Sequence, residues 1–215
     1  MRTLQTFSSC LARAVLVLLL SVSSSPQAQA HPKSKVRAQT VAVPESAAGE
    51  NPDSSRDHSL LLYNTHTGER LYIIYRRGSQ YIPPALARLD YFLRDHVTND
   101  VRHFDPRLYD ILADLTASVG HPGGEIDIVC GYRTPSTNAA LRAHTTGVAK
   151  NSLHIQAEAI DLRMPGIDTL VLRHAALALA RGGVGYYPHS DFIHVDTGRV
   201  RQWCFACAAE ATASD

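Results

Sequence analysis

Apolar and polar positions recur with two different periods along the folded part of this chain, which we expect to begin near Ser59. Two β-prone runs, 60–64 and 69–75, flank a Thr-His-Thr-Gly turn and predict a hairpin. Apolar residues then recur at helical spacing after Pro83-Pro84 and again after Asp105-Pro106. Both apolar stripes are typical of helices that cover a hydrophobic core. The first stripe comprises Leu86, Leu89, Phe92, Leu93 and Val97, and the second comprises Leu108, Ile111, Leu112, Leu115 and Val119.

Further strands and helices follow in an irregular order. Short apolar runs predict strands at 125–130 and 159–163. Thr134 or Ser136 can cap a helix between these strands, and Asp168 can cap a longer helix after them. Helices and a mostly antiparallel sheet in this order indicate an α+β domain, with a small sheet flanked by helices, rather than a repeating βαβ fold.

A final hairpin is predicted near the end of the chain, with strands at 184–187 and 192–196. Side chains alternate between the two faces of a strand, so His194 and Asp196 lie on one face. Val195 between them faces the other side, where it can anchor the strand in the core. The strand can therefore present two polar groups to a single cleft.

Residues 1–30 have the features of an export signal: basic residues, an apolar run at 14–20 and the small-residue site Ala28-Gln-Ala30. The apolar run is far shorter than the ~20 residues that a spanning helix requires, which favours cleavage over a membrane anchor. We therefore expect a mature protein that begins at His31, has no membrane span, and is exported to the periplasm or cell envelope.

The rest of the chain divides into three parts by composition. Residues 31–58 are rich in Ser, Pro, Ala and charged residues without apolar periodicity, which predicts a flexible linker. Residues 59–207 have the size of one domain, and 208–215 are expected to be a disordered tail. A net charge of +1 without a basic cluster argues against nucleic acid as a partner. We expect a monomer.

The chain has 4 cysteines, and Cys10 would leave with the export signal. The other three, Cys130, Cys204 and Cys207, cannot all pair within one chain. In an oxidising compartment Cys204 and Cys207 can form a short-loop disulfide, although C-x-x-C is also typical of redox and zinc half-sites. The favoured interpretation is a disulfide between two of the three thiols, and the pairing stays open.

Two segments carry the chemistry. Ser-Leu-His154 is followed by Asp161 seven residues later, and Asp191-Phe-Ile-His194-Val-Asp196 follows downstream. His154, Asp161 and His194 make a set of three ligands that would leave a catalytic zinc one open position for water or substrate. Asp191 and Asp196 flank the third ligand, so each is a candidate general base. The segments therefore predict a hydrolytic zinc site.

The S-x-H-x(6)-D segment and the later D-x-x-H or H-x-D resemble zinc D-Ala-D-Ala metallopeptidases of the M15 type, and in particular their MepK-like murein endopeptidase branch. The segment from Gly131-Tyr132-Arg133 to Arg142, and the Phe192 to Gly198 segment, are similar to that branch too. The resemblance covers roughly 59–204. Ala157 departs from the pattern, because the family usually has Gly there.

The resemblance implies a Hedgehog/DD-peptidase-like architecture and several roles in the site. Arg133 would face the zinc cleft, where it could stabilise an oxyanion or bind a substrate carboxylate. Ser152 and Tyr132 would contact substrate. The spacing favours Asp191 as the base, with Asp196 orienting His194, although the two roles could be exchanged.

The function that follows is an exported zinc metallopeptidase, which hydrolyses amide bonds in the peptide cross-links of peptidoglycan during cell-wall remodelling. Two alternatives stay open. One is a D,D- or L,D-carboxypeptidase or dipeptidase acting on stem peptides, which would need a closed pocket for a carboxylate. The other is a zinc-containing domain that binds murein without turnover, against which the base candidates argue.

Overall fold

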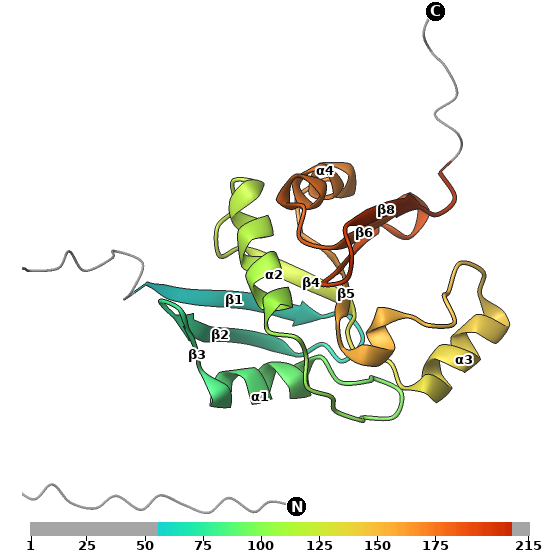
Figure 1. Ribbon diagram of the computed structural model, residues 1–215, viewed down its shortest axis with the longest axis horizontal. Coiled ribbons are helices and arrows are strands. Elements are labelled where there is room, and N and C mark those ends of the chain that lie inside the picture. Colours follow the sequence, from blue (N-terminus) through green and yellow to red (C-terminus); the bar gives the residue numbers. More distant parts are fainter. Residues whose placement is uncertain (1–55, 208–215) are drawn as a thin grey trace, which may run out of the picture. The chain divides into compact units, whose positions relative to one another are not determined.

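The structure of the protein, a computed structural model, describes residues 56–207. In this part of the chain an 8-stranded sheet has the order β3-β2-β1-β4-β5-β7-β6-β8 (Figure 1). Neighbouring strands are antiparallel except β1 with β4 and β6 with β8. The expected α+β class with a mostly antiparallel sheet is confirmed. The strands are β1 Asp57–Asn64, β2 Arg70–Arg77, β3 Gln80–Tyr81, β4 Glu125–Cys130, β5 Ala159–Arg163, β6 Gly183–Tyr187, β7 Phe192–Asp196 and β8 Arg201–Cys204.

The helices begin where the sequence supplies caps. The Thr134 side chain accepts a hydrogen bond from the Thr137 amide at the start of α3, and Asp168 accepts one from the Leu170 amide at the start of α4. The first helix ends earlier than its apolar stripe predicts, because Leu93 caps it and Val97 lies exposed in the turn that follows. The helices are α1 Pro83–Phe92, α2 Arg107–Ser118, α3 Pro135–His144 and α4 Thr169–Leu179, with short 3-10 turns η1 Leu153–Gln156 and η2 Pro188–Ser190.

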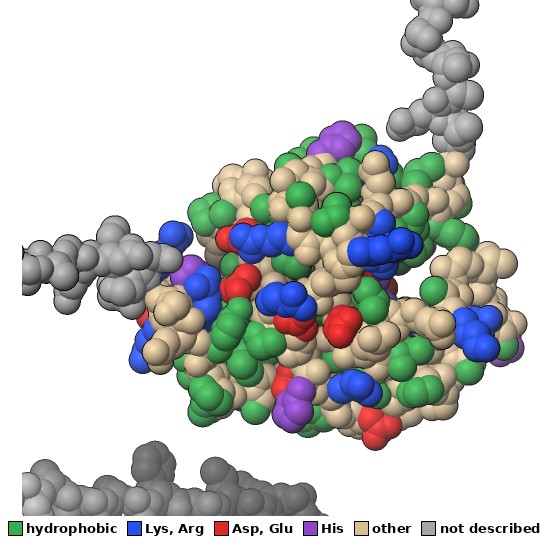
Figure 2. Space-filling view, in the orientation of Figure 1, with side chains coloured by type: hydrophobic (Ala, Val, Ile, Leu, Met, Phe, Trp, Pro, Cys, Tyr) green, Lys and Arg blue, Asp and Glu red, His purple; other side chains and the backbone are tan. Residues whose placement is uncertain are grey.

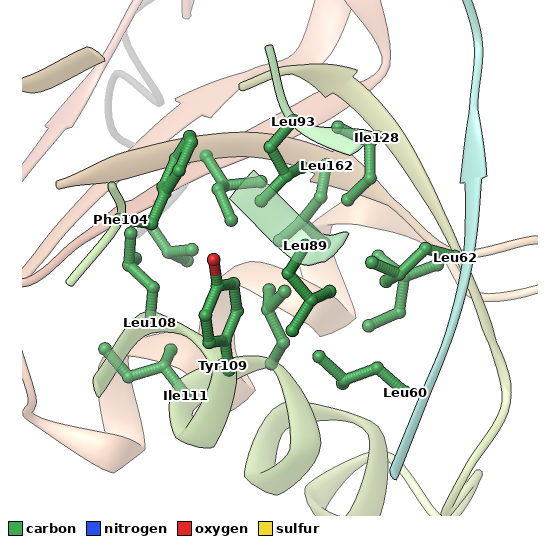
Figure 3. Close-up of a cluster of buried hydrophobic side chains, with 14 of the residues drawn as sticks. Leu60, Leu62, Leu89, Leu93, Phe104, Leu108, Tyr109, Ile111, Ile128 and Leu162 are labelled. Carbon is green, nitrogen blue, oxygen red and sulfur yellow. The ribbon is translucent and has the colours of Figure 1, made fainter. Parts of the chain in front are cut away.

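One face of the sheet carries the hydrophobic core. Leu89 of α1 and Leu108 of α2 meet strand residues such as Leu62, Ile128 and Leu162 in the cluster shown in Figure 3. Leu172 of α4 belongs to the same cluster. Each such side chain contributes about 1.5–3 kcal/mol when it is fully buried. Since these three helices cover one face of the sheet, the side chains on the opposite face of the central strands are available for a functional site.

Several predicted elements agree with the structure, and two strands were not predicted. The hairpins β1–β2 and β6–β7, the strands β4 and β5 and the helix α2 are present where the sequence indicates them. The short β3 and the parallel β8 were missed. Strand β1 begins at Asp57, two residues before the expected start of the domain. The export signal, most of the linker and the tail after Cys207 lie outside the described residues.

Two of the three cysteines among the described residues form a disulfide. It joins Cys204 to Cys207, and Cys130 is a free thiol. Acidic and basic side chains are interspersed over the face that Figure 2 shows. Within residues 56–207, none of the helices combines the length and the apolar character that a membrane span requires.

Candidate metal centre

A straight row of cross-strand neighbours runs over the sheet face opposite the core. Cys130 of β4 lies opposite Asp161 of β5, Asp161 opposite His194 of β7, and His194 opposite Gly185 of β6. Gly185 in turn lies opposite Trp203 of β8. Directly opposed residues point to the same face, with Cβ atoms about 4.5–5.5 Å apart. The sheet register therefore brings a thiol, a carboxylate and an imidazole side by side.

A local irregularity in β4 sets this row. The register shifts between Ile128 and Cys130, so that Ile128 faces Leu162 in the core while Cys130 faces Asp161. The extra residue, Val129, is a bulge of the kind that re-aims side chains next to functional sites. The bulge places Cys130 on the polar face at the point where β4 ends.

The second imidazole comes from a different element. His154 lies on η1, which ends at Ala157 with φ 58°, in the left-handed region. Glycine adopts this conformation without strain, which gives a physical reason for the glycine that the resemblance implies at this position. Ala157 adopts the conformation nonetheless and is completely buried, so the backbone path from His154 to Asp161 makes the turn that a glycine would make.

The nitrogen and oxygen atoms of three side chains converge on one point. His154 Nε2 is 3.2 Å from Asp161 Oδ1 and 3.1 Å from His194 Nδ1, and His194 Nδ1 is 2.8 Å from Asp161 Oδ1. Bonds of about 2.0–2.1 Å to a tetrahedral zinc would place such ligand atoms about 3.3 Å apart. The triangle therefore has nearly the size of a zinc coordination face.

Hydrogen bonds on the far side of each ring determine which nitrogen is available. His154 Nδ1 lies 2.7 Å from the Gly131 carbonyl oxygen and donates to it, so its Nε2 carries a lone pair. His194 Nε2 lies 3.1 Å from Asp196 Oδ2 and donates to it, so its Nδ1 carries a lone pair. Two lone pairs and one carboxylate thus face each other, and a cation between them would satisfy all three.

The electrostatics of Asp161 agree with this picture. Burial alone would raise the pKa of Asp161, but without a cation the rings of His154 and His194, when protonated toward Asp161, outweigh burial through their charge and hydrogen bonds and hold the pKa far below its usual range. A cation would replace these protons and leave the two lone pairs facing it. All three side chains are almost completely buried. A buried carboxylate that stays ionised requires positive charge beside it, which a divalent cation supplies.

Cys130 forms a second possible triplet with two of these residues. Its Sγ and the ligand atoms of His154 and Asp161 all lie within 4.8 Å of one another. Burial raises the pKa of the Cys130 thiol to about 12, and the negative charge of Asp161 adds to the effect. The triplet with His194 has the shorter distances and the available lone pair, so it is the better ligand set. Sequence reasoning treated Cys130 only as an odd thiol; its position before Gly131-Tyr132-Arg133 was the available signal.

The two acidic residues near His194 lie in very different places. Asp196 is buried; its Oδ1 accepts hydrogen bonds from the Gly183 and Gly198 amides, and Arg201 pairs with the carboxylate. Burial raises its pKa, but the hydrogen bonds from His194 and Arg201 outweigh burial and lower the pKa well below its usual range. The Asp196 carboxylate is therefore fixed in a position from which it orients the His194 ring. Arg201, its partner, was not recognised in the sequence.

Asp191 lies in the turn between β6 and β7, with φ 52°. Its side chain is 67 % exposed, lies 4.0 Å from Arg163, and accepts a hydrogen bond from the Thr169 hydroxyl. Thr169 begins α4, on the side of the sheet that carries the core helices. The spacing to His194 is thus present, but the carboxylate is directed toward α4.

The residues that the resemblance assigned to substrate also divide into two groups. Arg133 Nη2 donates a hydrogen bond to Ser152 Oγ at 3.1 Å, and both residues line the cleft above the metal site. The Arg133 Nε is buried and has no hydrogen-bond partner among the described residues. Tyr132, by contrast, belongs to the hydrophobic core, and its amide donates to the Leu93 carbonyl.

The cleft over the metal site has a volume of about 670 Å³. Its lining includes residues of α3 and of the segment 144–149 and, from β6 to β8, aromatic residues. Tyr187 and Phe192 stack with ring centroids 4.5 Å apart, and the Trp203 indole donates to the Tyr187 hydroxyl. Gly185 has no side chain, which leaves the space that the Trp203 ring occupies beside His194.

Comparison with known proteins identifies the family of this chain. The Peptidase_M15_2 family, described as peptidoglycan L,D-endopeptidase MepK, matches residues 53–203. A probable peptidoglycan L,D-endopeptidase MepK of Haemophilus influenzae is 45% identical over 144 residues, which is 67% of this chain and 77% of that protein. Peptidoglycan L,D-endopeptidase MepK of Escherichia coli is 42% identical over 148 residues, covering 69% of this chain and 81% of that protein.

Proposed function

Because this chain belongs to the Peptidase_M15_2 family of peptidoglycan L,D-endopeptidases, we propose that it hydrolyses peptide bonds in the cross-links of peptidoglycan during cell-wall remodelling. The two relatives are named as a probable L,D-endopeptidase and an L,D-endopeptidase of peptidoglycan. The observation that carries the proposal is the buried triangle of His154, Asp161 and His194 at the floor of an open cleft.

His154, Asp161 and His194 would hold zinc, since two imidazole nitrogens and one carboxylate oxygen are the usual ligands of a catalytic zinc. When bound, zinc supplies Lewis acidity, which polarises a scissile carbonyl and makes water a nucleophile at neutral pH. The protein's own part is to fix the two lone pairs and the carboxylate in one place. The Gly131 carbonyl and Asp196 do so by accepting the opposite ring protons.

Arg133 is assigned to the substrate. Its guanidinium lies in the cleft, and Nη2 donates a hydrogen bond to Ser152. A guanidinium in a cleft can bind a carboxylate of a stem peptide or stabilise the oxyanion that forms during hydrolysis. The same group would serve the carboxypeptidase alternative, in which it would bind the terminal carboxylate.

The acidic residues take separate roles in this proposal. Asp196 orients His194, as its contacts support. Asp191 stays the base that its spacing predicts, and its carboxylate would have to leave Thr169 to reach the cleft. Tyr132 supports the cleft from the core, since it is buried under the strand end that carries Arg133.

Export would deliver the enzyme to its substrate. Residues 1–30 are proposed to direct the chain to the periplasm or cell envelope, where peptidoglycan lies, and 31–55 to connect the cleaved end to the domain. This assignment rests on the sequence alone, since these residues lie outside the described part.

The proposal is tested by incubating the purified, zinc-loaded protein with intact sacculi and identifying the released fragments by mass spectrometry. Endopeptidase activity predicts that cross-linked fragments decrease and fragments with uncross-linked stems appear. Loss of single terminal residues with cross-links intact would instead show a carboxypeptidase. Zinc and sacculus binding without any released fragment would show a binding domain. His154→Ala serves as the control and is expected to release nothing.

A further inference from the structure

The chain continues past the part matched by the family into a short loop that is closed by a disulfide. The match ends at residue 203, and the disulfide joins Cys204 to Cys207 directly after it. Phe205 lies inside this loop. Its amide donates to the Tyr186 carbonyl at 2.9 Å, so the loop extends the pairing of β8 with β6 by one more residue.

The Phe205 ring crosses from one wall of the cleft to the other. On its own side it lies 5.8 Å from the Tyr187 ring, measured between centroids. On the opposite side it contacts Gly147, where an added Cβ would come within 2.4 Å of the ring. Gly147 has φ +85°, a conformation that favours glycine. The loop after α3 thus supplies a position without a side chain at the point that the ring reaches.

The bridge between Phe205 and Gly147 belongs to the same cleft as the metal site. Both residues line the cleft together with His154 and His194. Phe205 nevertheless keeps 36% of its surface exposed. A peptide in the cleft can cover this remaining surface, because apolar side chains such as Leu141 and Val148 line the same space. The ring is therefore positioned to contact an aliphatic part of the ligand, while Arg133 offers the charged contact.

We propose that Phe205 is a substrate-contacting residue that closes one end of the cleft, and that the Cys204–Cys207 disulfide is the device that positions its ring. The ligand class is a peptide with a small aliphatic segment and a carboxylate, so this inference rests on the proposed function. A disulfide between two cysteines three positions apart restricts the conformations of the loop before any ligand binds. It therefore reduces the conformational entropy that is lost when Phe205 contacts the ligand.

The only tryptophan of the chain provides a direct readout of the cleft. The sequence has 1 Trp, Trp203, which lies beside His194 and donates to the Tyr187 hydroxyl. Its fluorescence can be titrated with soluble stem peptides cut from sacculi, and the resulting Kd requires no turnover. Zinc content and circular dichroism of each variant show that the fold and the metal site are intact.

Phe205→Ala is expected to raise the Kd roughly fivefold, since a ligand can cover only part of the 36% of the Phe205 surface that is exposed. The KM for a soluble cross-linked peptide should rise by a similar factor while kcat stays unchanged. The matched control is Val200→Ala, an exposed apolar side chain in the turn before β8, and should change neither value. An unchanged Kd in Phe205→Ala overturns the proposal.

The double variant Cys204→Ser/Cys207→Ser tests the disulfide. The double variant should raise the Kd in the parent protein but have no further effect when combined with Phe205→Ala, because the role of the disulfide is to hold the Phe205 ring. Equal weakening in both backgrounds would overturn the positioning role. If no variant and no parent protein hydrolyses any peptidoglycan while the titration still distinguishes Phe205→Ala, the proposed activity fails and the binding contact stands.

Discussion

The far-side hydrogen bonds of two buried histidines direct their lone pairs toward one carboxylate oxygen. His154 donates to a backbone carbonyl, which no side-chain substitution can remove, whereas His194 donates to the carboxylate of Asp196. The two ligands therefore differ in how sensitive their orientation is to mutation. His154 is held by the backbone of the strand end at Gly131, and His194 depends on one acidic side chain.

The first prediction concerns the ligand set. The purified protein should hold about one zinc per chain, and His154→Ala or His194→Ala should lose it because each removes one of three ligands. Elemental analysis of the dialysed protein measures the stoichiometry. Cys130→Ser is the control and should retain the metal. Full zinc content in His194→Ala together with loss in Cys130→Ser would mean that the thiol, not the imidazole, completes the site.

The second prediction separates the two carboxylates. Asp196→Asn should weaken zinc affinity by about 10–100-fold, as removal of an orienting partner does. Asp191→Asn should retain zinc but lower turnover by ~10²–10⁴-fold, because Asp191 is the proposed general base.

Metal titration and assays on soluble peptides measure the two effects. The expected loss of turnover requires the β6–β7 turn to rearrange when substrate binds. Unchanged turnover in Asp191→Asn would instead mean that the carboxylate stays at Thr169 and that Asp191 is not the base.

Hydrogen bonds link the turn after α1 to the start of α3. Asp95 is completely buried; it accepts hydrogen bonds from the Thr134 amide at 2.8 Å and from the Val97 amide at 2.8 Å. Thr134 is the cap of α3 and directly follows Arg133. The carboxylate of Asp95 therefore positions the strand end that carries the cleft arginine.

The third prediction follows from the charge of Asp95. Burial raises its pKa, but the hydrogen bonds from Thr137, Thr134 and Val97 outweigh burial and lower the pKa to about 2. Asp95→Asn should lower the free energy of unfolding at pH 7 by about 2 kcal/mol. The unfolded carboxyl has a pKa near 3.9, so the contribution is full above pH ~4 and is lost as the pH falls toward 2.

Denaturant unfolding of parent and variant at pH 7 and at pH 3 measures the difference. The difference in the free energy of unfolding between the parent protein and Asp95→Asn should be smaller at pH 3 than at pH 7. Asp100→Asn is the matched control, since it changes an exposed carboxylate in the same turn and should be neutral at both values. If this difference in the free energy of unfolding does not change with pH, the Asp95 contacts do not depend on its charge.

The two faces of the sheet have different roles: one packs against the hydrophobic core, and the other carries the candidate metal site. Core helices cover one face, and the other face presents the row from Cys130 to Trp203. Substitutions on the core face are expected to act through folding, whereas substitutions in the row act on metal and substrate. The order of strands matters here, because β5 and β7 must be neighbours for Asp161 and His194 to meet.

The fourth prediction concerns the proposed export of the chain. Protein recovered from the envelope fraction should begin at His31, because Ala28-Gln-Ala30 presents small residues where a signal peptidase cleaves. N-terminal sequencing gives the answer directly. Chain that still begins at Met1 and sediments with membranes would mean that the segment is an anchor, which would tether the enzyme to the membrane.

Most of the helices and strands, and the family, could be predicted from the amino-acid sequence. Periodicity located both hairpins, the long helices and the central strands, and the motifs around His154 and His194 indicated the M15 relationship that the comparisons confirm. The alternation along β7 placed His194 and Asp196 on one face, as the pairing of β7 bears out. These features depend on residues close together in the chain, so local pattern is enough to predict them.

Which side chains share the site could not be predicted, because it depends on how distant parts of the chain pack together. Asp191 has the expected spacing, yet the left-handed turn directs its carboxylate to Thr169; Tyr132 adjoins Arg133, yet it is buried in the core. Cys130 joins the ligands through a bulge, and Phe205 reaches Gly147 only because β8 pairs with β6. Each of these placements depends on contacts between residues far apart in sequence, whose register is set by packing of the whole sheet and leaves no periodic signal in the chain.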